Sequence, residues 1–75
     1  MSGQTWALHV DVPVVSALLV IETSPDEAPM VHAVASIRRG ASPGAALAAQ
    51  GWSALGAGWL PRSWGAVAAV EPLAG

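Results

Sequence analysis

Residues 40–61, with the sequence GASPGAALAAQGWSALGAGWLP, carry no charge and are mostly Ala and Gly. Ser42 and Pro43 are residue types that cap a helix and occupy its first turn. Apolar side chains then recur at helical spacing, in a stripe made of Ala45, Ala48, Trp52, Leu55 and Trp59. The pattern predicts a helix, although Gly51 could end it early and leave a second short element before Pro61.

This stretch is long enough to cross a bilayer, and arginines flank it on both sides. However, Leu47, Leu55 and Leu60 are its only strong drivers of insertion, and Gly and Pro are frequent. We therefore expect no transmembrane helix. The N-terminus has no basic segment followed by an apolar run, so we expect no signal peptide and a cytoplasmic protein or a virion component.

The composition is that of a small chain with few stabilising features. Its 75 residues predict a single domain over residues 1–75, and they include no Cys, Phe or Tyr. A domain of this size buries only about 60–65% of its unfolded surface, so association with copies or partners is expected to supplement the fold. The net charge is −2 with three basic residues, all Arg, which disfavours binding to nucleic acid or anionic membranes. The amino-acid usage is typical of a GC-rich genome.

The first third of the chain predicts two strands. Trp6, Leu8, Val10 and Val12 alternate with Thr5, Ala7, His9 and Asp11, which indicates a strand over residues 4–12. Residues 14–23, VVSALLVIET, are rich in β-branched types and apolar on both faces, so this strand should be covered on both sides. The Val12-Pro13 junction is a poor two-residue turn, but we favour a hairpin over a single bent strand.

Residues 26–39 predict a helix. Ser24-Pro25-Asp26-Glu27 has the residue types of a helix start, and Asp26 as the cap places Pro29 in the first turn. Met30, Val31, Val34 and Ile37 then recur at helical spacing. Arg38, Arg39 and Gly40 suit a helix end. The alternative, a strand over residues 30–37, puts Met30 and Val34 on one face with His32 and Ser36.

The final element is predicted to be a strand over residues 64–71, stopped by Pro72. The expected fold class is therefore α+β, in the order β-β-α-α-β, with an Ala/Gly-rich helical hairpin packed on a small sheet.

Residues 37–53 resemble the first two-thirds of a helix-turn-helix. A helix would end at Arg38-Arg39-Gly40, a Ser-capped helix with paired Ala would follow, and then a Gly-containing turn. The resemblance implies nucleic-acid binding. Against it, the would-be recognition helix over residues 53–60 has no Arg, Lys, Asn or Gln to read base edges.

Few residues suggest chemistry. His9 and Asp11 project from the same face of the first strand and could bind a metal or orient a general base, but no third ligand is indicated. A solvated polar face explains them more simply, and it also explains His32. No nucleophile elbow and no phosphate-binding loop is present. We expect no enzyme, no catalytic or metal-binding residues and no cofactor, with a small metal-dependent enzyme as the second alternative function.

The tryptophans suggest an interaction surface. Trp and Arg are over-represented at interface hot spots. We expect the interface to include residues close together late in the chain, namely Trp52, Trp59, Arg62 and Trp64. The simpler interpretation is that the tryptophans form the core. The predicted function is a non-enzymatic interaction or assembly protein that forms homo-oligomers or docks on a larger protein, for example as a subunit of a larger particle. The first alternative is a helix-turn-helix-type nucleic-acid-binding protein.

Overall fold

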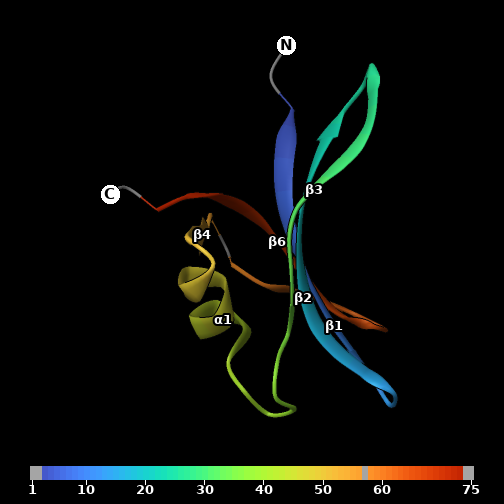
Figure 1. The fold of residues 1–75 in the computed structure, drawn as a ribbon, viewed down its shortest axis with the longest axis vertical. Coiled ribbons are helices and arrows are strands. Elements are labelled where there is room, and N and C mark those ends of the chain that lie inside the picture. The colour runs from blue at the N-terminus through green and yellow to red at the C-terminus, as the bar shows by residue number, and fades with distance from the viewer. Residues whose placement is uncertain (1–2, 57, 74–75) are drawn as a thin grey trace.

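The computed structural model describes residues 3–56 and 58–73, and most of them belong to antiparallel strands (Figure 1). The elements in chain order are β1 (Gln4–Val12), β2 (Val15–Ser24), β3 (Glu27–Ser36), α1 (Pro43–Ala49), β4 (Trp52–Ala54), β5 (Leu60–Arg62) and β6 (Gly65–Pro72). The predicted α+β fold with a helical hairpin is therefore wrong. Within the described ranges the chain forms a β-sheet and one helix of 7 residues.

The sheet has the strand order β3-β2-β1-β6-β4, and β5 also pairs with β6. β4 and β5 share one side of β6: β4 pairs with residues 70–72 and β5 with residues 65–67. β3 forms the opposite edge. Figure 1 shows α1 against one side of the sheet only. We call that side the covered face and the other side the open face.

The predicted strands over residues 4–12, 14–23 and 64–71 are confirmed to within about one residue, and so is the first hairpin. Its loop is Pro13-Val14, because Val12 pairs with Val15. No non-glycine residue in the described ranges has a positive φ, so this is not one of the favoured primed turns. Arg39 compensates: its guanidinium donates to a carboxylate oxygen of Asp11 at 2.8 Å and to the carbonyls of Val12 and Pro13 at 2.8 and 3.1 Å.

The predicted helix over residues 26–39 is wrong, and the alternative strand is right. Ser24 pairs with Glu27 across a Pro25-Asp26 loop, so the apparent helix start is a second hairpin turn. A proline φ near −65° suits the first position of a helix and the second position of a tight turn equally well. Pro29 lies on the edge strand β3, where its missing N–H is tolerated.

The helix in residues 40–61 is shorter than the Ala and Trp stripe predicts. Ser42 caps it as expected, with its hydroxyl oxygen accepting from the Ala45 amide at 3.4 Å. Gly51, at φ 88°, follows the helix and turns the chain into β4, which is the early ending that the sequence allowed. Ala45 and Ala48 are exposed, and Leu47, which is outside the predicted stripe, is the buried residue of α1. No pair of consecutive helices exists in residues 37–53, so the helix-turn-helix resemblance does not extend to the fold.

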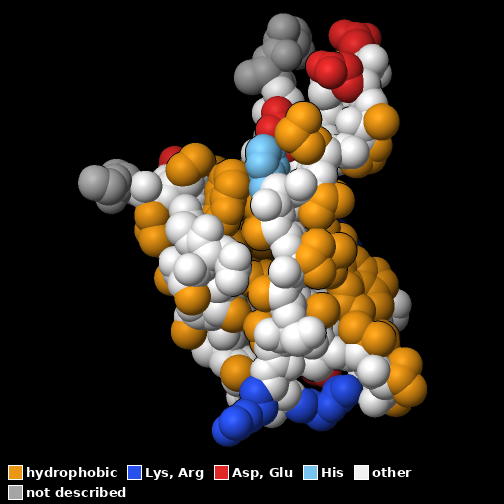
Figure 2. Space-filling view, viewed as in Figure 1, with side chains coloured by type: hydrophobic (Ala, Val, Ile, Leu, Met, Phe, Trp, Pro, Cys, Tyr) orange, Lys and Arg blue, Asp and Glu red, His pale blue; other side chains and the backbone are white. Residues whose placement is uncertain are grey.

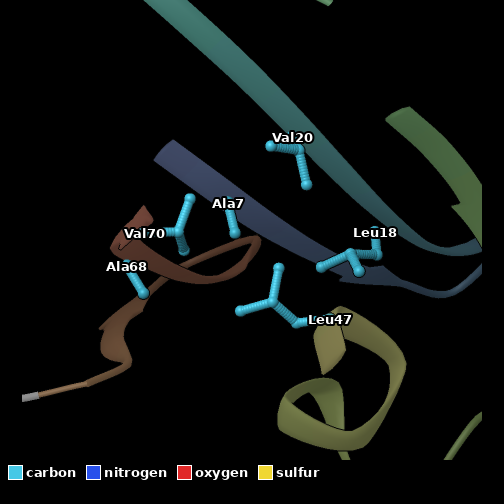
Figure 3. Close-up of a cluster of buried hydrophobic side chains, with 6 residues drawn as sticks. All are labelled: Ala7, Leu18, Val20, Leu47, Ala68 and Val70. Atoms are coloured by element: carbon cyan, nitrogen blue, oxygen red, sulfur yellow. The ribbon is translucent and has the colours of Figure 1, made fainter. Parts of the chain in front are cut away.

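The core is thin and lies between α1 and the covered face (Figure 3). Leu47 reaches from α1 towards side chains of β1, β2 and β6. The buried cluster consists of Ala7, Leu18, Val20, Leu47, Ala68 and Val70. The largest fully buried side chains in this cluster are Leu18, Leu47 and Val20. No helix in the described part of the chain is long and apolar enough to cross a membrane.

Gly65 allows β1 and β6 to approach each other. Its φ is 146°, in the region that favours glycine, and a Cβ placed on it would collide with the carbonyl oxygen of His9. The adjacent Trp64 carbonyl accepts from the Asp11 amide at 2.7 Å. The turn before β6 therefore depends on the absence of a side chain at this position.

Candidate functional site

The open face is a continuous apolar surface that spans four strands. Successive side chains of a strand point to opposite faces, so the register defines which residues share this side. Trp6 pairs with Ile21 and Ala69, and Leu8 pairs with Leu19 and Val67. The apolar members of the open face in these strands are Trp6, Leu8, Val10, Val12, Val15, Ala17, Leu19, Ile21, Val31, Val34, Val67 and Ala69, and the polar Gln4, Thr23 and Ser36 share this side.

None of the apolar side chains on this face is buried. On the edge strand, Val31 is 57% exposed and Val34 is 64% exposed. Val15, at the first turn, is 44% exposed. Figure 2 shows hydrophobic side chains gathered along the side of the sheet that lies away from α1. The largest contiguous apolar patch of a protein is often functional, so this face is the candidate site.

The two sides of β1 are reversed from the usual arrangement, in which the apolar side of a strand faces the core. Its more polar side, with Ala7, His9 and Asp11, lies on the covered face, and Ala7 is fully buried there. Its apolar side, with Trp6, Leu8 and Val10, is the one left open. Small residues on the covered face explain why α1 packs on that side. The alanines at positions 7, 33 and 68 leave room for α1, Trp52 and Trp59 close to the sheet. The sequence predicts a cover on both sides of β2, and α1 supplies only one.

His9 and Asp11, the candidate metal or general-base pair, do not converge. The ring of His9 meets the edge of Trp59, with the ring centroids 6.4 Å apart. Asp11 pairs instead with Arg39. His9 therefore packs against a tryptophan, and Asp11 forms an ion pair beside the first turn.

His32 is placed by a β-bulge. Val20 pairs with Ala33 and Ile21 with Val31, so His32 is the extra residue of β3. Its Nε2 lies 2.8 Å from a carboxylate oxygen of Glu22, and its ring lies 5.4 Å from that of Trp52. These contacts link the edge strand β3 to its neighbour β2 and to Trp52 of β4.

The four predicted interface residues are not gathered on one surface. Trp52 and Trp59 are half-buried and pack against the core from the covered side, and none of the four tryptophans belongs to the fully buried cluster. Arg62 is exposed at the end of β5, where it pairs with Gly65, and Trp64 is half-buried in the turn between β5 and β6. Their role in an interface stays a prediction.

Trp6, the fourth tryptophan, belongs to the open face. Its indole Nε1 donates to the Thr23 hydroxyl at 3.3 Å across the first hairpin. The apolar patterns in the sequence indicate this surface, because the apolar side of residues 4–12 lies in register with one apolar side of residues 14–23. The patterns do not indicate which side of the sheet the helix covers.

No pocket is found in the part of the chain that the structure describes, and no three His, Asp or Glu side chains come together there as metal ligands would. No family model, curated protein or solved structure matches this chain. The open face is therefore the feature on which a function can be argued.

Proposed function

We propose that this protein is a non-enzymatic interaction subunit that binds a protein surface, its own or another, through the open face. The main observation behind this proposal is the orientation of β1, which turns Trp6, Leu8 and Val10 away from the helix. A chain that functioned as a free monomer would gain stability by turning Trp6, Leu8 and Val10 towards the helix instead.

The size of the face supports the proposal. Four strands spaced about 4.8 Å apart, over about eight residues at about 3.3 Å each, cover roughly 500 Å². Burial of apolar surface is the main favourable contribution to association, and it must exceed an entropic cost of about 4–15 kcal/mol. The surface that the partner buries adds to this favourable contribution.

The marginal core is a second support. Six residues form the buried cluster, and two of them are alanines. A partner on the open face would complete a second core layer for β1 and β2, which are apolar on that side too. The interaction would then contribute to folding as well as to assembly.

Cross-linking inside the cell that makes the protein tests this proposal. A photoactivatable amino acid replaces Val34 on the open face in one variant and Ala49, exposed on α1, in the control. We expect the Val34 variant to give a discrete cross-linked protein product. Its mass should be either twice that of the chain, for a second copy, or that of the chain plus a larger partner. A product from the Ala49 position alone, or from neither position, would contradict the proposal.

A further inference from the structure

The charged residues of this protein are separated between the two ends of the sheet. Arg38 and Arg39 follow β3, and Arg39 contacts Asp11 at the end of β1. Arg62 pairs with Gly65, which pairs with Val10, so it belongs to the same end. This basic end therefore combines three arginines with one aspartate. Figure 2 shows basic side chains at the lower tip of the molecule.

The opposite end of the sheet is acidic. Glu22 pairs with Thr5 near the start of β1, and Asp26 and Glu27 lie at the turn between β2 and β3. Glu71 lies near the end of β6, beyond the residues that pair with β1. Together with the basic end, these residues account for all eight charged side chains of the chain. The open face between the two ends carries none of them.

The open face also suits a second sheet. Two apolar sheets pack face to face about 10 Å apart, with their strands about 30° from parallel or antiparallel. Two copies of a face of roughly 500 Å² would bury roughly 1,000 Å² together, which reaches the lower limit for a specific interface. Each copy would provide the layer that the other lacks.

We propose that the open face is covered by a second copy of this chain, packed with its strands antiparallel. This inference rests on the proposed function and names the partner. A two-fold axis between the sheets and perpendicular to the strands places the basic end of each copy against the acidic end of the other. An axis along the strands would instead bring Glu22, Asp26 and Glu27 close to their own copies, and like charges oppose that orientation.

The two orientations place different residues opposite each other. Gln4 and Val12 lie at the two ends of β1, and both belong to the open side of that strand. In the antiparallel dimer, Gln4 of one copy faces the Val12 end of the other, and like ends never meet. Because the chain contains no cysteine, Gln4→Cys and Val12→Cys each introduce a single thiol. A short bismaleimide is the probe, since sheets about 10 Å apart are too distant for a disulfide.

We expect a mixture of the two variants, with one of them carrying a mass tag, to form the mixed cross-linked dimer. The yield should exceed that of either variant alone several-fold. An Ala49→Cys control on the outer side of α1 should stay uncross-linked. Each variant is first compared with the unmodified protein by thermal unfolding, and only variants that unfold cooperatively are used. Efficient cross-linking of Gln4→Cys with itself would overturn the antiparallel orientation.

Sedimentation of the unmodified protein tests for the dimer without any substitution. We expect a dimer at micromolar concentration, in reversible exchange with monomer. A monomer at every concentration would overturn the inference. If the Val34 position still cross-links to another protein in the cell, the proposed function stands without it. If it does not, both fall.

Discussion

At the scale of single residues, Gly65 has the most demanding position. A side chain there must adopt a φ of 146° and would also meet the His9 carbonyl oxygen of β1. We expect Gly65→Ala to lower the free energy of unfolding by more than about 2 kcal/mol, because backbone strain and displacement of β1 add together.

Gly40→Ala is the matched control for Gly65→Ala. Gly40 also has a positive φ, 88°, but a Cβ there would meet no atom within 4 Å. It should cost only the backbone strain, about 1–2 kcal/mol. Urea unfolding of both variants measures the difference, and equal costs would contradict the close approach of β6 to β1.

Leu47 is the other residue with a large expected effect. It is 1% exposed and is the one buried side chain of α1, so it links the helix to the sheet. Leu47→Ala should destabilise the fold by about 2–5 kcal/mol through lost burial and a cavity. Leu55→Ala, at a side chain that is 38% exposed, should cost about 1 kcal/mol or less. Thermal unfolding followed by circular dichroism compares the two, and similar melting temperatures would argue against α1 as the cover of the core.

At the scale of elements, the first hairpin depends on a distant residue. Arg39 donates to Asp11, Val12 and Pro13, which are 26 to 28 positions away in the chain. Arg39→Gln should destabilise the protein by about 1 kcal/mol or less, since the ion pair is largely exposed.

Arg38→Gln is the control, because it removes the same charge at the neighbouring position, where no bond to this turn is made. Unfolding in low and high salt should show that part of the Arg39 effect is screened. An equal effect of the two substitutions in every condition would mean that the turn does not need the guanidinium.

Three strands were predictable, β1 from its alternation of apolar and more polar residues, β2 from its β-branched content, and β6 from a two-residue period that ends at Pro72. β3 was not, because Pro25 suits a helix start and a tight turn equally, and a bulge at His32 breaks the alternation. The length of α1 was set by Gly51 rather than by the Ala and Trp stripe. The site was half visible: the apolar sides of β1 and β2 can be read from the sequence, but the side covered by α1 depends on tertiary packing around small alanines.

At the scale of the whole molecule, we expect that the open face cannot accept a charge without losing its partner. Val34 is 64% exposed in the single chain, so Val34→Lys should change the stability of an isolated monomer little. Burying the ammonium in the dimer should weaken association by about 2 kcal/mol or more.

Val14→Lys is the control for that substitution, since Val14 is 89% exposed in the turn between β1 and β2. Sedimentation should find Val34→Lys monomeric at concentrations where Val14→Lys still associates. Association unchanged by Val34→Lys would place the contact elsewhere, for example at Trp64 and Arg62.

The most direct measurement of whether the open face is covered is the rate at which a thiol placed on it reacts. The protein lacks cysteine, so Val34→Cys and Ala49→Cys each report a single position. We expect the labelling of Val34→Cys by a maleimide to slow as protein concentration rises, while Ala49→Cys reacts at a constant rate. Equal, fast and concentration-independent labelling of both thiols would contradict a second copy on the open face.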